Sequence, residues 1–382
     1  MKILYHHRIA SKDGQYVHVE EITKALKAMG HEIIMVGPAS VETDSFGSEG
    51  GIVSILKRYI PKFAYELMEF FYAFYAYYKL KRAIVEHKPD VMYERYNLYM
   101  PAGIWIKKKF NLPMLLEVNA PLFDERSKFG GIAIPWLARW TENYTWRNAD
   151  YALPVTQVLA DRVRQAGVAD DKLIVIPNGI DLEKFSNSLS DDEAKEKLGL
   201  SGKLVLGFTG FMREWHGLER VLELLSSDSA QERHLLLVGD GPARKSIEKR
   251  ADELGVKDNL TITGIVGRDS ISRYVAAFDV ALQPDVVDYA SPLKLFEYMI
   301  MARAIVAPDM ANIREVLADH ENALLFEKGN INALFVAVEE LCEDEDLRQK
   351  ISDGARETVF NRKYTWKNNA ERIVSLFENM SA

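Results

Sequence analysis

The sequence has very little cysteine. Cys342 is the only one among 382 residues, so the chain can form no internal disulfide and no cysteine-based zinc site. Such a composition suits a reducing compartment. The chain also lacks a run of about 18 uncharged apolar residues, the length that a membrane-spanning helix needs, and its N-terminal apolar run is too short for a signal peptide. These absences favour a globular protein of the cytoplasm.

An excess of positive charge is also missing. The chain carries 48 Lys and Arg against 56 Asp and Glu, a net charge of −8. Residues 1–185 contain 24 against 22 and residues 186–382 contain 24 against 34, so the negative charge is concentrated in the second half. Proteins that bind nucleic acid usually present a basic face to the phosphate backbone, and we expect no nucleic-acid partner. The first half is nearly neutral and can lie against an anionic surface.

Two familiar patterns are incomplete. Gly239-Asp240-Gly241 follows an apolar run, but Pro242 and Ala243 come next and the third glycine of a dinucleotide fingerprint is missing, so we do not expect NAD. The one literal Asp-x-Asp, Asp344-Glu345-Asp346, lies in an acidic run that is typical of a solvated face. We therefore expect no metal site.

Short apolar runs alternate with helical segments along the chain, which predicts parallel sheets with crossover helices. A chain of 382 residues is too long for a single hydrophobic core of ordinary size. A polar stretch at 186–202 separates two parts of the chain that both show this alternation. We therefore predict an α/β protein with two domains, residues 1–185 and 186–365, followed by a last helix within 366–382.

One stretch, residues 291–299, joins a polar loop to a predicted helix between two predicted strands. Pro292 suits the first turn of a helix, because its missing N–H would have had no partner there. The free N–H groups of a helix N-terminus attract anions, and Lys294 adds a full positive charge. Glu297, one turn further along, can accept hydrogen bonds from hydroxyl groups. A nucleotide diphosphate with its ribose would satisfy all of these groups.

Polar residues also follow predicted strands in the first domain. Arg95 follows the apolar run 91–93, and Asn119 follows the run 114–118. Open α/β sheets bind ligands beyond the carboxyl ends of their strands, so both are candidate binding residues. Gly14 lies in the loop after the first strand, where a backbone without a side chain can approach a ligand, although a plain turn explains it equally well.

The predicted helix at 62–87 is unusually aromatic. Only a narrow face, with Lys62, Glu66 and Glu69, is charged, and the apolar arc is wider than one side of a sheet usually covers. Two stripes make up that arc: Phe63, Leu67, Phe70, Phe71, Phe74, Tyr77 and Tyr78, and beside them Tyr65, Met68, Tyr72 and Tyr75. Two interpretations are open: a helix buried on two sides, or an interfacial helix that touches lipid or a partner subunit.

Four motifs together resemble glycosyltransferase family four. They lie at residues 176–181, 207–217, 238–242 and 291–299, and residues 1–37 resemble the start of the family's sequences. The resemblance covers nearly the whole chain. It implies the GT-B fold, in which two Rossmann-like domains with parallel sheets face each other across a cleft, and a retaining enzyme that uses nucleotide sugars. The donor would lie mostly on the second domain and the acceptor on the first, with the helix at 366–382 packing back on the first domain.

The resemblance also assigns roles to single residues. Arg213 matches the family's diphosphate-binding arginine, and His216 stands where a lysine is usual. Glu297 matches the second glutamate of a Glu-x7-Glu pattern, which holds the ribose hydroxyls. The first glutamate of that pattern is replaced by Tyr289. The family often has a histidine where this chain has Asn119.

The donor sugar then needs another partner, and the alternatives are Asp285, Asp288 or the N–H groups around residues 290–293. Backbone groups of Val266 would meet the base. The expected catalytic residues are Arg213, Lys294 and Asn119, and Arg95 and Asn119 are the candidates on the acceptor side. The expected donor site comprises Gly14, Gly210, Arg213, His216, Val266, Tyr289, Ser291, Pro292, Leu293, Lys294 and Glu297.

We therefore expect a hexosyltransferase that moves a sugar from a nucleotide-diphosphate sugar to a glycan or lipid-linked acceptor in cell-surface polysaccharide or glycolipid synthesis. Arg213, Lys294 and the helix N-terminus would stabilise the leaving diphosphate in place of a metal, so no cofactor is expected. A membrane surface at the inner face of the cell membrane, or a second copy of the chain, would meet helix 62–87. The alternatives are a nucleotide-sugar epimerase or hydrolase of the same fold and a non-catalytic nucleotide-sugar-binding subunit.

Overall fold

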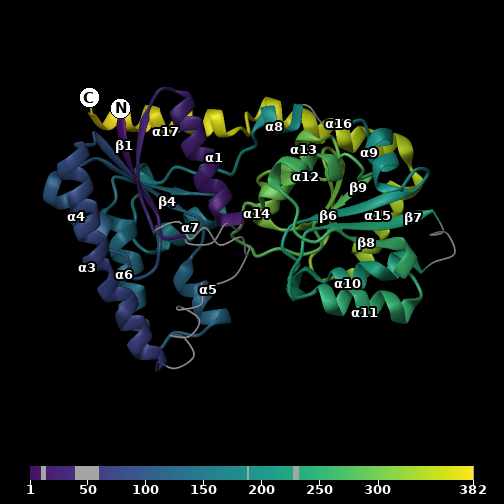
Figure 1. Ribbon diagram of the computed structural model, residues 1–382, viewed down its shortest axis with the longest axis horizontal. Coiled ribbons are helices and arrows are strands. Elements are labelled where there is room, and N and C mark those ends of the chain that lie inside the picture. Colours follow the sequence, from purple (N-terminus) through teal and green to yellow (C-terminus); the bar gives the residue numbers. More distant parts are fainter. Residues whose placement is uncertain (10–13, 39–59, 187–188, 227–231, 382) are drawn as a thin grey trace. The chain divides into compact units, whose positions relative to one another are not determined.

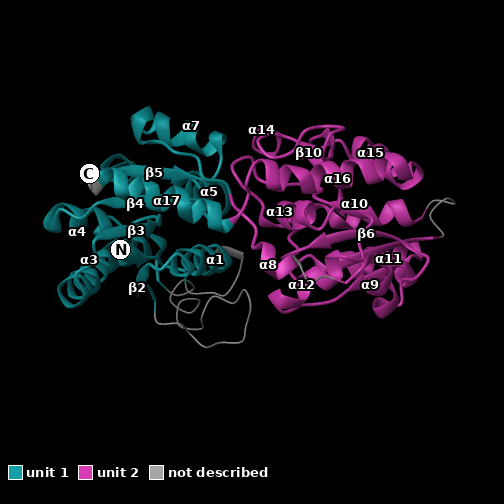
Figure 2. Cartoon of the chain, turned by 90° about the horizontal axis from the view of Figure 1, so that it is seen from above, with its two compact units in different colours: residues 1–177, 366–382 teal, residues 178–365 magenta. Residues whose placement is uncertain are grey.

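The computed structural model describes the chain except for residues 10–13, 39–59, 187–188, 227–231 and 382 (Figure 1). The described chain forms two compact units: unit 1 has residues 1–177 and 366–382, and unit 2 has residues 178–365 (Figure 2). The first boundary lies before residue 185, where the sequence analysis placed it, because the intervening segment bonds to unit 2. Asn178 donates to Ser291, and the N–H of Ile180 donates to the carbonyl of Tyr364.

Unit 1 contains a five-stranded parallel sheet in the order β2-β1-β3-β4-β5. Strands β3 and β4 are buried along their whole length, as is typical of parallel strands that helices cover on both faces. The strands are β1 (Lys2–His6), β2 (Glu32–Val36), β3 (Val91–Arg95), β4 (Met114–Val118) and β5 (Tyr151–Pro154). The helices are α1 (Gly14–Ala28), α3 (Lys62–His87), α4 (Ala102–Phe110), α5 (Leu122–Phe129), α6 (Pro135–Asn148), α7 (Gln157–Gln165) and, from the end of the chain, α17 (Trp366–Ser381).

Helix α17 is fastened to unit 1 at several points. The ring of Trp366 packs edge-on against His18 of α1, with 4.8 Å between the ring centroids. The side chain of Asn369 donates to the carbonyl of Pro177 (2.7 Å), and that of Arg372 donates to the carbonyl of Val175 (2.8 Å). The last helix therefore covers the first unit, although it follows the last element of the second.

Unit 2 contains a six-stranded parallel sheet in the order β11-β10-β9-β6-β7-β8. The strands are β6 (Leu204–Thr209), β7 (Arg233–Val238), β8 (Leu260–Ile262), β9 (Val280–Leu282), β10 (Ala304–Asp309) and β11 (Leu324–Glu327). The α-helices are α8 (Leu182–Ser186), α9 (Asp191–Leu198), α10 (Leu218–Val221), α11 (Arg244–Leu254), α12 (Arg268–Val275), α13 (Leu293–Ile300), α14 (Ala311–Arg314), α15 (Ile331–Glu343) and α16 (Glu345–Asn361).

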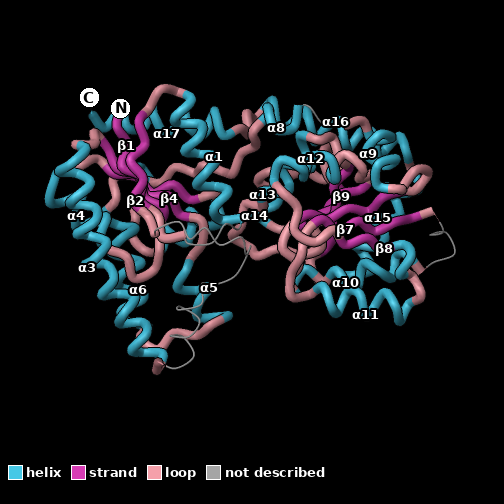
Figure 3. Tube along the Cα trace, in the orientation of Figure 1, coloured by secondary structure: helices cyan, strands magenta, loops and turns pink. Residues whose placement is uncertain are grey.

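The strands of unit 2 contribute side chains to two hydrophobic cores, one on each face of the sheet. Successive side chains of a strand point to opposite faces. In β6, Val205 packs into the core with residues of α9, α12 and α13, whereas Leu206 and Phe208 pack into the core with α10, α11 and α15. Figure 3 shows helices on both sides of these strands. The prediction of two α/β units with parallel sheets is confirmed.

Both sheets have the same switch in strand order. Strand β1 lies between β2 and β3, and β6 lies between β7 and β9. Where the order of an open parallel sheet reverses, a crevice opens at the carboxyl ends of the strands, and ligands bind there. Ligand-binding residues are therefore expected in the segments that follow β1 and β3 in unit 1, and in those that follow β6 and β9 in unit 2.

Helix α3 spans Lys62–His87, as its aromatic spacing predicted, but it is turned with its aromatic side outward. Phe63, Phe71 and Tyr78 are 55%, 60% and 62% exposed. Glu66, predicted on the charged face, is buried, and its carboxylate accepts hydrogen bonds from the backbone N–H groups of Ala133 and Ile134 and from the Tyr99 hydroxyl. Leu67 and Phe70 pack against the core of unit 1, whereas the rest of the aromatic surface of α3 is largely left uncovered by the described residues of that unit.

Candidate functional site

The loop after β6 carries three of the predicted residues. Gly210 has a φ of +121°, a conformation that favours glycine, and a Cβ there would lie 3.4 Å from Nζ of Lys294. Arg213 is exposed, and its guanidinium lies 4.8 Å from the ring centroid of Trp215. Nδ1 of His216 accepts a hydrogen bond from the backbone N–H of Arg213 (3.2 Å), which fixes the turn of the loop.

Lys294 reaches the same loop from helix α13. Its ammonium lies 3.6 Å from the ring centroid of Phe208, a cation–π contact. The imidazole of His216 packs edge-on against the same ring, with 5.0 Å between centroids. No carboxylate among the described residues lies within ion-pair distance of Arg213 or Lys294. The structure thus gathers two cations and an imidazole at the carboxyl end of β6.

The titration of these groups reflects their burial. Burial lowers the pKa of Lys294 to about 7, although Glu297 acts in the opposite direction. Burial, together with the charges of Lys294 and Arg213, lowers the pKa of His216 to about 3. His216 is therefore neutral at pH 7, and since its Nδ1 accepts a hydrogen bond, its Nε2 carries the proton. A bound anion would restore the charge of Lys294 and accept this N–H.

The loop between β9 and α13 is anchored by two buried asparagines. Nδ2 of Asn178 donates to the carbonyl of Ser291 (2.6 Å), and Nδ2 of Asn312 donates to the carbonyl of Ala290 (2.8 Å). Both side-chain oxygens are buried without a hydrogen-bond partner among the described residues. Neither residue is among those predicted from the sequence to form the site. Asn178 lies within the motif at 176–181, whereas nothing in the sequence marks Asn312.

Helix α13 begins one residue later than expected. Pro292 is its N-cap, with a ψ of 119° that is extended and not helical, so Leu293 is the first helical residue. The predicted place of Pro292 in the first turn is wrong for this reason. Glu297 is buried in the helix. Next to it, the Tyr298 hydroxyl accepts a hydrogen bond from the backbone N–H of Thr209 (2.8 Å), which ties α13 to the end of β6.

The other predicted donor residues lie in different elements. Val266 lies in the segment that connects β8 to α12 and is partly buried against the core. Tyr289 is half-buried in the loop before α13. Gly14 is the first residue of α1 and belongs to unit 1. Of the two aspartates proposed to replace the missing glutamate, Asp288 is exposed. Asp285 shares a small hollow of about 30 Å³ with His216 and Arg220.

In unit 1, the predicted Arg95 and Asn119 meet at a buried carboxylate, Glu117. Nη1 of Arg95 donates to Oε1 of Glu117 (2.5 Å), and the side-chain amide of Asn119 donates to the same oxygen. The Tyr93 hydroxyl donates to Oε2 (2.9 Å), and Nδ1 of His18 lies 3.2 Å from Oε1. Burial raises the pKa of Glu117, but its cationic neighbours and hydrogen bonds outweigh this and hold the pKa below its usual value.

A second buried pair lies beside this cluster. Nδ1 of His6 and Oε2 of Glu94 are 2.5 Å apart. A Cβ at position 103 would overlap that carboxylate oxygen, so Gly103 leaves the space that Glu94 occupies. Glu94 follows the apolar run 91–93 and is a candidate on the same ground as Arg95, but nothing in the sequence marks His6 or Glu117, because a charged residue inside an apolar strand gives no sign of which partner it meets.

No group of three or more metal-ligating side chains is found in the described part of the chain. The acidic run expected to be a solvated face begins helix α16. The Asp344 carboxylate accepts a hydrogen bond from the backbone N–H of Leu347 (2.8 Å) and so caps the helix, and Glu345 and Asp346 lie in its first turn.

Two family descriptions match the chain. "Glycosyl transferases group 1" matches residues 190–358, and "Glycosyltransferase Family 4" matches residues 12–184. The first match therefore lies within unit 2 and the second mostly within unit 1.

Relatives and solved structures agree with these matches. The chain is 23% identical to the alpha-D-kanosaminyltransferase of Streptomyces kanamyceticus over 64% of this chain and 65% of that protein, just under two thirds of its length. It is 23% identical to the phosphatidyl-myo-inositol mannosyltransferase of Mycobacterium leprae over 96% of this chain and 93% of that protein. The crystal structure of Anabaena Alr3699/HepE in complex with UDP shares its fold, with a TM-score of 0.79 at 17% identity over 99% of this chain and all of that one. The chain belongs to the family 4 glycosyltransferases and has the GT-B fold.

Proposed function

We propose that the protein transfers a hexose from a nucleotide-diphosphate sugar to a glycan or lipid-linked acceptor, with retention of configuration and without a metal ion. The observation that carries this proposal is a pair of cations, Arg213 and Lys294, at the carboxyl end of β6, with no carboxylate of the described residues within ion-pair distance of either. The switch in strand order predicts a ligand at this place. The complex of Alr3699/HepE with UDP supports a nucleotide donor, and the names of the relatives support sugar transfer.

The charges account for the reaction. The bond between the anomeric carbon and the diphosphate oxygen breaks, a bond from that carbon to an acceptor hydroxyl oxygen forms, and the hydroxyl proton passes to the departing diphosphate oxygen. The departing diphosphate gains negative charge, which Arg213, Lys294 and the N-terminus of α13 stabilise without reorganising. Neutral His216 donates a hydrogen bond from Nε2 to the same group. This set of donors provides the charge that a metal ion would otherwise supply.

The donor sugar would be held by Asp285, because Tyr289 stands where the family has a glutamate. Asp285 is half-buried and lies in the hollow with His216, whereas Asp288 is exposed. Replacing Asp285→Asn should raise KM for the sugar donor about tenfold to 100-fold, as loss of one hydrogen bond to a charged group would, and leave the affinity for the nucleoside diphosphate unchanged. Equal changes in both would show that Asp285 acts on the nucleotide instead.

A lipid-linked acceptor fits the exposed face of α3. The stripe of Phe63, Phe71, Phe74, Tyr75 and Tyr78 ends at two exposed cations, Lys81 and Arg82. On α6, Trp136 is 72% exposed, and Trp140 packs against Phe70 of α3. Aromatic side chains favour the boundary between lipid and water, and anionic lipids attract basic residues beside them. We propose that this face rests on the inner surface of the cell membrane. In the part of the chain that the structure describes, no helix has the length and hydropathy of a membrane span.

One experiment separates the transferase from its alternatives. The purified protein is incubated with UDP-sugars, and free UDP is measured with and without lipid-linked and soluble acceptors. A transferase releases UDP at an increased rate only when an acceptor is present. Release that is independent of any acceptor would indicate a hydrolase, a changed sugar without release an epimerase, and tight binding without turnover a non-catalytic subunit.

A further inference from the structure

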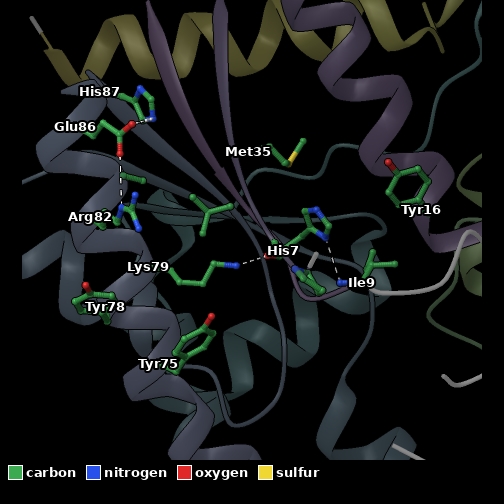
Figure 4. A pocket seen from close by; sticks show the side chains of 14 residues that line it. His7, Ile9, Tyr16, Met35, Tyr75, Tyr78, Lys79, Arg82, Glu86 and His87 are labelled. Atoms are coloured by element: carbon green, nitrogen blue, oxygen red, sulfur yellow. Dashed lines mark hydrogen bonds and ion pairs between the residues drawn. The ribbon is translucent and has the colours of Figure 1, made fainter. Parts of the chain in front are cut away.

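Unit 1 contains a second hollow, which neither the site in unit 2 nor the cluster around Glu117 accounts for. Its volume is about 610 Å³. One wall comes from the ends of β1 and β2 and from His7, Ile9, Gly37 and Pro38 just after them, and the opposite wall comes from the C-terminal half of α3 (Figure 4). The hollow therefore lies at the carboxyl ends of β1 and β2 and borders the exposed stripe of α3.

The hollow has hydrogen-bond donors on both walls. From α3, Lys79 donates to the carbonyl of Gly37 (2.7 Å), and no described carboxylate lies within ion-pair distance of its ammonium. Arg82 is 3.7 Å from Glu86, an exposed pair in which both side chains keep most of their contact with water. Exposed pairs of this kind are weak, so the guanidinium is available to a ligand.

The facing wall adds a neutral imidazole. Nδ1 of His7 accepts a hydrogen bond from the backbone N–H of Ile9 (3.2 Å). Burial and the charges of His6 and Arg95 lower the pKa of His7 to about 4, so near pH 7 the ring is neutral and its proton sits on Nε2. A Cβ at position 37 would lie 2.6 Å from that nitrogen, so Gly37 leaves room for the ring.

Aromatic rings connect the hollow to the outer face of α3. Tyr75 and Tyr78 line it and are both more than half exposed. On the other side of Tyr78 and Arg82 lies a shallower hollow of about 340 Å³, which Lys81, Val85 and Glu86 complete. A ligand with an anionic group between Lys79, Arg82 and His7 could thus lay an apolar chain over Tyr78 toward Val85.

We propose that this hollow binds the phosphate of an amphiphilic acceptor, with Lys79 and Arg82 as its ligands and the chain of the acceptor on the stripe of α3. Charge favours this occupant, because Glu86 is the single carboxylate among the described residues that line the hollow, whereas Lys79 and Arg82 supply two cations. The inference rests on the proposed function, since it names the class of acceptor as a lipid-linked phosphate. The phosphate itself could also belong to a small soluble molecule, and the experiment distinguishes the two sources.

Titration calorimetry with three probes tests the proposal on the full chain: octyl phosphate below its micelle concentration, inorganic phosphate, and octyl glucoside as a neutral amphiphile of the same chain length. Octyl phosphate should bind most tightly. Lys79→Gln with Arg82→Gln should weaken its binding about 100-fold, because each of the two lost charged hydrogen bonds contributes roughly a factor of ten. Glu86→Gln should tighten it severalfold.

The matched control is Lys172→Gln with Lys367→Gln, which removes the same charge from two exposed positions of unit 1 that do not line the hollow and should leave the affinity unchanged. Equal weakening in the control would mean a general charge effect and overturn the proposal, as would the absence of octyl phosphate binding. Equal affinity for inorganic phosphate would overturn the amphiphilic part. UDP binding and acceptor-dependent UDP release are measured on the same samples. Transfer without octyl phosphate binding refutes this inference alone, and octyl phosphate binding without transfer to any acceptor refutes the proposed function alone.

Discussion

The two units have the same plan but treat charge at the switch in strand order in opposite ways. In unit 1 two buried carboxylates at the ends of β3 and β4 have partners within the unit: Glu117 accepts a hydrogen bond from Arg95, and Glu94 lies 2.5 Å from Nδ1 of His6. In unit 2 the corresponding position gathers Arg213 and Lys294 without a carboxylate within ion-pair distance among the described residues. Removing one partner of a buried ion pair destabilises the fold because it leaves an uncompensated charge. A cation in a ligand crevice without a neighbouring carboxylate is instead suited to bind an anion from outside. The donor's diphosphate is the anion that we expect in unit 2.

The largest effect should come from removing one of the unpaired cations. Lys294→Met should lower kcat/KM at least about 100-fold, because loss of one preorganised donor to the developing charge costs roughly 10²–10³ in rate. Steady-state release of UDP in the presence of acceptor measures this. Lys249→Met is the control, since the Lys249 side chain is 79% exposed on α11, and it should behave as the wild type. A decrease in kcat/KM of less than about threefold in Lys294→Met would show that Lys294 does not stabilise the leaving group.

Breaking the paired charges of unit 1 should cost stability instead. Glu117→Gln leaves Arg95 buried without its anion, and the expected loss is about 3 kcal/mol in the free energy of unfolding. Differential scanning calorimetry should show the transition of unit 1 at lower temperature, while titration of UDP gives an unchanged affinity. Glu248→Gln, which alters an exposed pair with Arg244, is the control and should not shift the transition. If Glu117→Gln melts at the same temperature as the wild type, Glu117 does not stabilise unit 1 by compensating the buried charge of Arg95.

The pH dependence of UDP binding gives a second test of the role of Lys294 in unit 2. Because the pKa of Lys294 is lowered to about 7, this lysine is charged below pH 7 and loses its proton above it. UDP raises the pKa by favouring the charged form, so affinity should fall as pH rises from 7 to 9, by up to about tenfold per unit. Lys294→Arg keeps its charge over this range and should show a flat profile. A parallel fall in both proteins would assign the titration to another group.

The smallest expected effect concerns the exposed stripe of α3. Phe71→Glu with Tyr75→Glu places two negative charges on the face proposed to meet anionic lipid, and flotation with phosphatidylglycerol vesicles should fall about tenfold. The matched control is Lys172→Gln with Lys367→Gln, which changes the net charge by the same amount at two exposed positions outside α3 and α6 and should float like the wild type. Equal flotation of wild type and stripe variant, with a change from dimer to monomer in light scattering, would identify the face as a contact between copies.

The sequence predicted most of what depends on local pattern. Apolar runs located the strands, and the aromatic spacing gave helix α3 its bounds at Lys62–His87. The pattern could not tell which side of α3 faces outward, because that depends on the partners of Glu66, which lie far along the chain at residues 133–134. Helical periodicity identifies a face, but tertiary contacts decide whether it is buried.

The same distinction between local pattern and tertiary contact applies to the residues of the candidate sites. Arg213 and Lys294 could be named from the sequence because each lies in a loop or helix start next to a strand, so local order was enough. Glu117 and Asn312 could not, because their roles come from contacts with residues of other elements: Arg95 in β3, and the loop before α13. A charge inside an apolar strand predicts that a partner exists, but not which residue it is.

Titration of UDP into the wild type and into Arg213→Gln with Lys294→Met tests the central claim most directly, because it measures binding at the unpaired cations without the reaction. The account predicts that the double variant binds UDP at least about 100-fold more weakly at about pH 6.5, where Lys294 is charged in the wild type, while its melting temperature without UDP is unchanged or higher. Equal affinities in the two proteins would contradict the account, because the diphosphate would then bind without the cations that we assign to it.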